Sequence, residues 1–205
     1  MEGESKYTDI ACIIFAGGKS RRMGEDKALL PFGGKNSLSE FQYEKFKPYF
    51  ENIYISTKYK EKFDFEANFI EDIQFYEKDD HSMPIYSPAV ALYSVFKKYS
   101  FNKIFAISVD TPFFSIEHFK KLYENDNSAL DILMPRSKEG IHPLCAVYKK
   151  SCEDELLKMI EQDVHKLRIL TKSLNTEYID FEDEKPFLNL NDKETYHKAL
   201  EIKNW

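Results

Sequence analysis

The chain has 205 residues, of which 42% are hydrophobic and 15% aromatic, so it carries enough apolar side chains for a core and is not a disordered protein. Its net charge of −6 argues against a nucleic-acid coat or a polybasic membrane binder. The polar N-terminal stretch MEGESKYTD and the lack of a long apolar run predict a cytoplasmic protein that binds neither membrane nor nucleic acid.

The apolar pattern along the chain predicts alternating strands and helices. Continuous apolar runs indicate buried strands, whereas apolar positions three or four apart indicate helices. Strands are expected at 10–16, 52–57, 67–72, 103–110, 130–135, 143–150 and 176–181, and helices at 38–50, 87–99, 115–126, 152–162, 165–174 and 192–202. This order predicts an α/β fold with three layers, in which helices cover both faces of a mostly parallel sheet.

Glycine and positive charge are concentrated in one stretch. Five of the seven glycines fall within residues 13–34, together with Lys19, Arg21, Arg22 and Lys27. A loop that follows a strand of a parallel sheet lies at the carboxyl edge, where open α/β folds bind ligands. Glycine amides and basic side chains can both bind phosphate oxygens, although two glycines can also form a plain turn. Neither the P-loop nor the dinucleotide fingerprint is present, so the sequence predicts a phosphate-binding loop of another kind.

The stretch AGGKSRRMGEDK (16–27) resembles the signature of the molybdenum cofactor guanylyltransferase family. In that family Ala-Gly-Gly is followed by three variable residues, then Arg-Met-Gly and Asp-Lys. Related enzymes that build sugar nucleotides usually carry Pro-Lys in place of Asp26-Lys27. The resemblance covers roughly residues 10–200 and implies one domain, 1–205, with a Rossmann-like fold similar to nucleotide-diphospho-sugar transferases. Residues 10–110 would then bind the nucleotide and residues 111–205 the acceptor.

The resemblance also implies the residues of the site. Asp110 would hold the Mg²⁺ that bridges the nucleotide phosphates, and Arg22 and Lys27 would join it as catalytic residues that neutralise phosphate charge. The family's nucleotide contacts correspond to Phe15, Ala16, Gly17, Gly18, Lys27, Ser56, Asp72 and Asp110, and its acceptor contacts to His142, Pro143, Asn189 and Asn191. The backbone amides of residues 16–18 would hold the nucleotide. Ser56 departs from the family, which commonly has asparagine there.

Two expectations concern side chains near the end of the chain and the histidines. Asn189 and Asn191 would project to the same face of an extended stretch, because alternate residues of a strand do so.

No histidine is needed as a general base, because a phosphate nucleophile is already ionised at pH 7. The remaining histidines are therefore interpreted as surface or helix residues; they are His81, His118, His165 and His197.

The activity that the resemblance implies is Mg²⁺-dependent transfer of GMP from GTP to the terminal phosphate of molybdopterin, with release of pyrophosphate and formation of a guanine dinucleotide cofactor. Proteins of molybdoenzyme assembly would be its partners. However, the segment IYSPAVAL (85–92) departs from the family's Gly-Pro-Leu-x-Gly near the base. A CTP-dependent molybdopterin cytidylyltransferase, a sugar-phosphate nucleotidyltransferase and a non-catalytic nucleotide-binding partner in molybdoenzyme assembly therefore stay open as alternatives.

Overall fold

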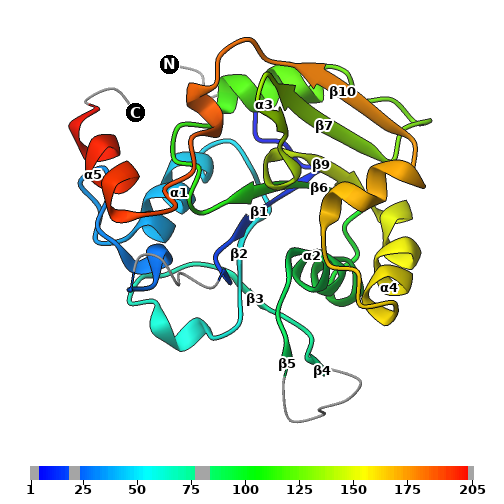
Figure 1. Ribbon diagram of the computed structural model, residues 1–205, viewed down its shortest axis with the longest axis horizontal. Helices are drawn as coiled ribbons and strands as arrows, with labels where there is room; N and C mark the ends of the chain where they lie inside the picture. Colours follow the sequence, from blue (N-terminus) through cyan, green and yellow to red (C-terminus); the bar gives the residue numbers. More distant parts are fainter. Residues whose placement is uncertain (1–4, 19–23, 77–83, 203–205) are drawn as a thin grey trace.

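In the computed structural model of the chain, residues 5–18, 24–76 and 84–202 are described. Within them, an eight-stranded sheet has the order β10-β7-β9-β6-β1-β2-β3, and β8 pairs with β7 (Figure 1). The strands are β1 (Ala11–Phe15), β2 (Ile53–Thr57), β3 (Phe69–Glu71), β6 (Lys103–Ser108), β7 (Ile132–Ser137), β8 (Gly140–Ile141), β9 (Val147–Lys149) and β10 (Thr176–Asp180). β1, β2, β3 and β6 run parallel, whereas β9 runs antiparallel to β6 and β7.

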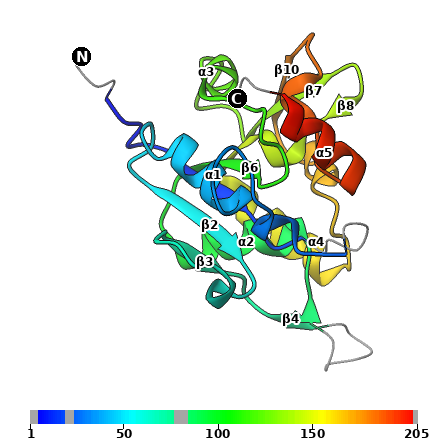
Figure 2. The same ribbon diagram turned by 90° about the vertical axis from the view of Figure 1, so that its left-hand side faces the viewer.

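Helices cover both faces of this sheet (Figures 1 and 2). One face carries α1 (Leu38–Phe46), α3 (Ile116–Tyr123) and α5 (Lys193–Glu201), and the other carries α2 (Pro88–Lys98) and α4 (Glu153–Glu161). β1 is apolar throughout because Cys12 and Ile14 face the first core while Ala11, Ile13 and Phe15 face the second. The predicted three-layer α/β fold is confirmed. None of the helices in the described residues is long and apolar enough to cross a membrane.

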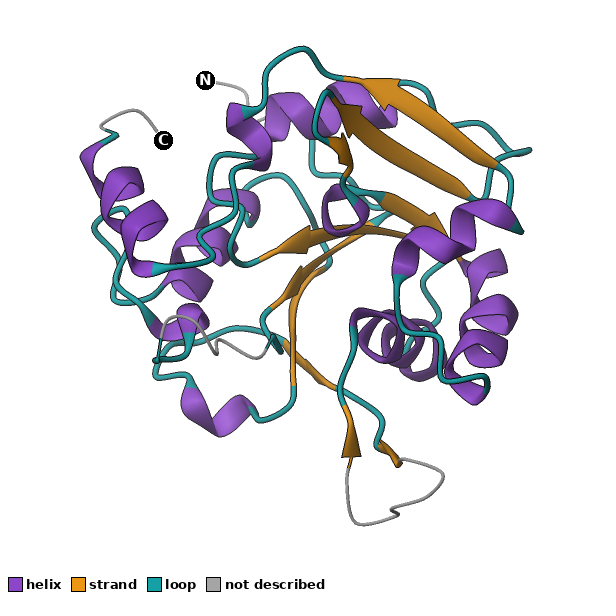
Figure 3. Cartoon of the chain, viewed as in Figure 1, coloured by secondary structure: helices purple, strands orange, loops and turns teal. Residues whose placement is uncertain are grey.

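Short elements complete the chain between these layers. The 3-10 helices are η1 (Lys27–Leu29), η2 (Lys60–Lys62), η3 (Pro143–Cys145), η4 (Lys150–Cys152), η5 (Leu167–Lys172) and η6 (Lys185–Phe187). β4 (Phe75–Tyr76) and β5 (Pro84–Ile85) form a separate antiparallel pair. This pair projects from the body of the protein at the bottom of Figure 3, where strands are orange and helices purple.

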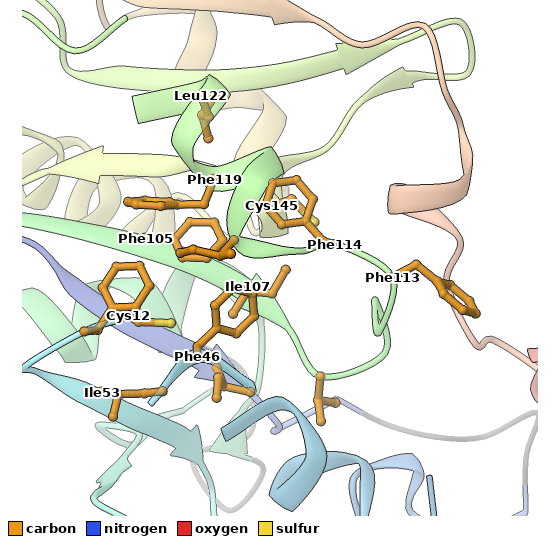
Figure 4. Packing of buried hydrophobic residues seen from close by; sticks show 14 of the residues in the cluster. Cys12, Phe46, Ile53, Phe105, Ile107, Phe113, Phe114, Phe119, Leu122 and Cys145 are labelled. Carbon is orange, nitrogen blue, oxygen red and sulfur yellow. The ribbon is translucent and has the colours of Figure 1, made fainter. Parts of the chain in front are cut away.

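Aromatic packing anchors the centre of the sheet to the helices on its first face. Phe105 of β6 lies between Phe46 of α1 and Phe119 of α3 (Figure 4), with ring centroids 5.7 Å and 4.8 Å away. All three rings are fully buried, and such pairs add to the stability gained from apolar burial. This packing joins β6 to α1 and α3, and Asp110 follows two residues after the end of the strand.

Three predicted elements differ from the structure. The first helix ends at Phe46 rather than residue 50, because Pro48 has no N–H with which to continue the helical hydrogen bonds. The expected strand at 143–150 begins with the 3-10 helix η3, and only Val147–Lys149 forms a strand. The expected α-helix at 165–174 is the 3-10 helix η5, whose buried Leu167 and Leu170 lie three residues apart and match its three-residue period.

Candidate active site

A cavity of about 320 Å³ lies where the carboxyl ends of β1, β2, β3 and β6 meet. Of the residues predicted to contact nucleotide, it is lined by Phe15, Ala16, Gly17, Gly18, Lys27, Asp72 and Asp110. Ser56 lies behind the wall instead, because it is only 1% exposed and its hydroxyl donates to Asp72 Oδ1 at 3.1 Å. Arg22 lies outside the described residues.

The glycine loop leaves one side of this cavity open. A Cβ built on Gly17 would lie 3.6 Å from Asp72 Oδ2, and one built on Gly18 would meet no atom within 4 Å. Neither glycine has a positive φ, so the backbone conformation does not require glycine at either position. A ligand that approaches the backbone closely would require glycine, because it needs the space that a side chain would fill. The expectation for the Ala16 amide is wrong, because this amide donates to the Ser56 carbonyl at 2.8 Å and continues the sheet pairing.

Lys27 and Asp110, which both line this cavity, meet Asn191 from the C-terminal part of the chain. Lys27 Nζ lies 2.7 Å from Asp110 Oδ2 and 3.0 Å from Asn191 Oδ1. The other carboxylate oxygen of Asp110 accepts a hydrogen bond of 2.5 Å from the Ser108 hydroxyl, which fixes the orientation of the carboxylate. The side chains of Lys27 and Asp110 are each 15% exposed. Three residues from distant parts of the sequence thus form one cluster of opposite charges and polar oxygens.

Lys62, which sequence reasoning missed, ties together the two ends of the glycine loop. Its ammonium donates to the Ala16 carbonyl at 3.0 Å and to Asp26 Oδ2 at 2.7 Å. Asp26 Oδ1 also accepts a hydrogen bond of 3.0 Å from the Ala28 amide, so the same carboxylate caps η1, in which Lys27 is the first residue. Lys62 therefore helps to fix where Lys27 leaves the backbone.

A second missed residue, Gln42 of α1, holds the segment around Asp110. Its side chain is fully buried, and Nε2 donates to the carbonyls of Ser108 at 3.1 Å and Thr111 at 3.0 Å. These carbonyls lie on either side of Asp110 in the sequence. A buried amide that binds both of them restricts the turn from which the carboxylate projects.

Asp72 faces the glycine loop from the end of β3. Burial raises the pKa of its carboxyl to about 6, although the hydrogen bond from Ser56 and the charges of Lys58 and Lys98 act in the opposite direction. The Lys58 ammonium lies 3.7 Å from the ring centre of Tyr86, which also lines the cavity. The cavity therefore holds a protonatable acid on the side opposite Asp110, with a cation and an aromatic ring beside it.

A second cavity of about 1030 Å³ adjoins the first. Pro88, Ser108, Asp110 and Leu144 line both cavities, so the two meet beside Asp110. The residues predicted to contact the acceptor all line the second cavity; they are His142, Pro143, Asn189 and Asn191. Three further basic residues that line it were not predicted, namely His165, Lys166 and Arg168.

Two expectations about this second cavity need correction. The stretch around Asn189 is not extended, because the Asn191 amide donates to the Asn189 carbonyl at 2.9 Å and closes a three-residue turn. His165 lies just before η5 rather than in an α-helix, and its side chain is partly exposed. Its Nδ1 lies 3.2 Å from the Ser87 hydroxyl, and its Nε2 lies 2.8 Å from Asp163 Oδ1.

His142 is a fixed part of the wall. Its ring stacks on Phe187 with centroids 3.8 Å apart and planes 9° apart, and Nε2 lies 2.8 Å from the Ser137 hydroxyl. Burial lowers the pKa of the imidazole, which favours the neutral ring. His142 can therefore offer a flat, uncharged surface and a hydrogen bond to a ligand.

The cluster of Lys27, Asp110 and Asn191, which lies where the two cavities meet, fits a magnesium ion that arrives with phosphates. Asp110 and Asn191 present oxygen atoms, which Mg²⁺ prefers, and in the structure these oxygens hold the Lys27 ammonium as a stand-in cation. No group of three or more His, Cys, Asp or Glu residues that could hold a metal occurs in the described part of the chain. One or two protein oxygens suffice when substrate phosphates and water complete the coordination.

A parallel sheet with a cavity beyond its carboxyl ends, walled by a glycine loop, a lysine and an aspartate, is typical of α/β proteins that bind nucleotides. Comparison with known proteins defines the class further. The chain belongs to the family of MobA-like NTP transferase domains, whose sequence profile matches residues 12–177. It is therefore a nucleotidyltransferase.

Relatives of the chain agree with this assignment. It is 34% identical to the molybdenum cofactor guanylyltransferase of Campylobacter jejuni over 193 residues, or 94% of this chain and 96% of the relative. It is 29% identical to the enzyme of the same name from Helicobacter pylori over 199 residues, or 95% and 93% of the two chains. The crystal structure of molybdopterin-guanine dinucleotide biosynthesis protein A from Archaeoglobus fulgidus superposes with a TM-score of 0.76 at 24% identity, covering 94% of this chain and 97% of that chain. The family resemblance and the fold are both confirmed.

Proposed function

We propose that the chain transfers GMP from GTP to the terminal phosphate of molybdopterin, releases pyrophosphate and so forms a guanine dinucleotide cofactor. The observation that carries this proposal is the meeting of two cavities at Asp110. A reaction between a nucleotide and a second phosphate requires both substrates to be held side by side. GTP and molybdopterin are the favoured pair because the relatives are named molybdenum cofactor guanylyltransferases.

The residues of the first cavity, together with Asn191 at its border with the second, would act on the nucleotide. The amides of Gly17 and Gly18 would hold the phosphates, and Lys27 would neutralise the charge that builds on the leaving pyrophosphate. Asp110 and Asn191 would hold Mg²⁺, which would neutralise phosphate charge between the two substrates. No side chain needs to remove a proton, because the attacking phosphate is ionised at pH 7. Positioning and charge neutralisation would therefore provide most of the rate enhancement.

The residues of the second cavity would act on the acceptor. Lys166 and Arg168 bring positive charge to a cavity that would hold a phosphorylated substrate, and Asn189 adds an amide. The neutral, stacked ring of His142 would contact the uncharged part of that substrate. Residues 10–110 would thus bind the nucleotide and residues 111–205 the acceptor within one domain.

A second candidate is transfer of CMP from CTP to the same acceptor. Tyr86, Ser87 and Pro88 line the nucleotide cavity in the segment that departs from the family pattern. Because Ser87 and Ala91 stand at the two glycine positions of the family's Gly-Pro-Leu-x-Gly, the base that the chain selects has to be measured separately from its activity.

Thermal unfolding with GTP, CTP, UTP and ATP, each with and without Mg²⁺, tests the nucleotide directly. A ligand at 100 times its Kd adds about 2.7 kcal/mol to the free energy of unfolding, which corresponds to a Tm rise of about 5–11 °C for a chain of this size. Of the four nucleotides, we expect only GTP to give this rise. Mg²⁺ should increase the rise in the wild type but not in Asp110→Asn. A rise with CTP instead would select the second candidate, and no rise with any nucleotide would contradict both.

A further inference from the structure

We propose that the Lys27 ammonium occupies the cation position of the site until a nucleotide arrives, so that a divalent metal binds only together with phosphates that draw Lys27 away. The identity of the nucleotide rests on the proposed function. The exchange itself concerns only the chain and a divalent ion. Lys27 would then alternate between two partners, the Asp110 and Asn191 oxygens in one state and the nucleotide phosphates in the other.

The contacts of Lys27 are those that a metal ion would make. Its Nζ lies within hydrogen-bond distance of one carboxylate oxygen of Asp110 and the amide oxygen of Asn191, at 2.7 Å and 3.0 Å. Both are hard oxygen donors, the type that Mg²⁺ selects. An ammonium and a divalent ion cannot share the same oxygens without strong repulsion, and Lys27 and Asp110 are only 15% exposed, so solvent screens this repulsion weakly. The two cations therefore compete.

The surroundings allow Lys27 to move while Asp110 stays in place. The start of η1 is fixed by the Asp26 cap and by Lys62, so the flexible stem of Lys27 can swing without a change in the backbone. The Ser108 hydroxyl holds the second oxygen of Asp110 at 2.5 Å, and Gln42 holds the carbonyls on either side. Lys27 is thus the movable member of the pair.

The exchange predicts an order of binding. A free divalent ion must displace the Lys27 ammonium from both oxygens, and it brings no anion that could accept this ammonium in exchange. A metal–nucleotide complex brings phosphate oxygens that can accept Lys27, so the loss of the Asp110 contact is offset. The negative charge of Asp110 remains neutralised in both states. Metal affinity should therefore depend strongly on nucleotide in the wild type and less so when Lys27 has no charge.

Titration of the protein with Mn²⁺ alone tests the exchange without a nucleotide. Electron paramagnetic resonance measures the free ion at each step. A positive charge next to a carboxylate weakens proton binding by that carboxylate by about 10- to 1000-fold, and removal of the charge should strengthen the binding of another cation by a similar factor. We expect Lys27→Met and Lys27→Gln to bind Mn²⁺ about 10- to 100-fold more tightly than the wild type, and Lys27→Arg to stay as weak as the wild type. The gain should disappear in Lys27→Met/Asp110→Asn.

Lys58→Met is the matched control. It removes the same charge from the wall of the same cavity, but Lys58 faces Tyr86 and Asp72 rather than Asp110. We expect it to change Mn²⁺ affinity less than about threefold. Wild-type protein that binds Mn²⁺ alone as tightly as Lys27→Met, or a gain that persists in Lys27→Met/Asp110→Asn, would overturn the proposal.

A second titration in the presence of nucleotide, without acceptor, separates this proposal from the proposed function. GTP should increase the Mn²⁺ affinity of the wild type at least about tenfold and that of Lys27→Met by a smaller factor. If CTP produces the increase and GTP does not, the exchange by Lys27 stands and guanylyl transfer is wrong. If neither nucleotide produces it, the exchange is wrong as well.

Discussion

Replacement of Asp72 by asparagine should stabilise the protein at neutral pH. The variant keeps an oxygen that can accept the hydrogen bond from Ser56, but it cannot ionise. Burial raises the pKa of the Asp72 carboxyl from 3.8 to about 6 in the folded chain. The folded protein therefore binds this proton more tightly than the unfolded chain does. The stabilisation from the proton is complete below about pH 4 and is lost as the pH rises through 6.

The magnitude follows from the difference between the two pKa values. At about 1.36 kcal/mol per pKa unit, a change from 3.8 to about 6 corresponds to about 3 kcal/mol of unfolding free energy. Asp72→Asn lacks this pH dependence, so its advantage over the wild type should grow by about 2.5 kcal/mol between pH 4 and pH 7, since part of the total is already lost at pH 4. In a chain of this size the change is equivalent to about 5–10 °C in Tm.

Urea unfolding of both proteins between pH 4 and pH 7.5 measures this difference. Glu71→Gln is the control, because it removes a negative charge from the adjacent position and leaves the Ser56–Asp72 hydrogen bond intact. Ser56→Ala removes a hydrogen bond that lowers the pKa of Asp72, so its stability should fall more steeply with pH than that of the wild type. A stability difference between wild type and Asp72→Asn that is the same at pH 4 and pH 7 would refute the reasoning.

Three further substitutions test Lys62, Gln42 and Lys45; Lys45 lies in α1, and its ammonium donates to the Pro112 carbonyl at 2.8 Å. Lys62→Met should raise the KM for nucleotide several-fold, and Lys62→Arg should restore it. The free energy of unfolding in denaturant should fall by less than about 1 kcal/mol in Lys62→Met, since a partly exposed ion pair stabilises little. An unchanged KM in Lys62→Met would exclude a role of Lys62 in fixing the glycine loop. Gln42→Leu should lower kcat, and it should lower the free energy of unfolding in the same assay by about 1–2 kcal/mol. A wild-type kcat in this variant would show that Asp110 needs no support from α1. Burial lowers the pKa of Lys45 from 10.5 to about 7, so the folded chain binds this proton less tightly than the unfolded chain does. The free energy of unfolding of the wild type should therefore rise between pH 7 and pH 10.5. An equal rise in Lys45→Met would show that Lys45 does not cause it.

The sequence predicted those features that depend on neighbouring residues. The apolar run that forms β1 predicts a strand covered on both faces, and its alternate residues enter the two cores as expected. The position of Asp110 at the end of β6 places it at the same edge as the glycine loop, because both strands are parallel. Ser87 and Pro88 begin α2 as a cap and first residue, as their residue types predict.

Features that depend on distant contacts could not be predicted in this way. Lys62 acts on residues 36 and 46 positions away, and Gln42 on residues 66 and 69 positions away, so no local pattern singles them out. The turn at Asn189 arises where the next amide, that of Leu190, donates to the Asp110 carbonyl at 2.9 Å. This contact joins the C-terminal part of the chain to the segment that carries Asp110, and it replaces the extended backbone that the alternating asparagines suggested.

The most direct test of the central claim is transfer of the α-phosphate itself. GTP labelled at the α-phosphate is incubated with the purified chain, Mg²⁺ and molybdopterin, and the products are separated and identified. The account predicts that the label enters a guanine dinucleotide product with one pyrophosphate released per transfer, and that Lys27→Ala and Asp110→Asn lower the rate by about 100-fold or more. The account would be contradicted if the label stays in GTP with molybdopterin present, or if Lys27→Ala transfers it at the wild-type rate.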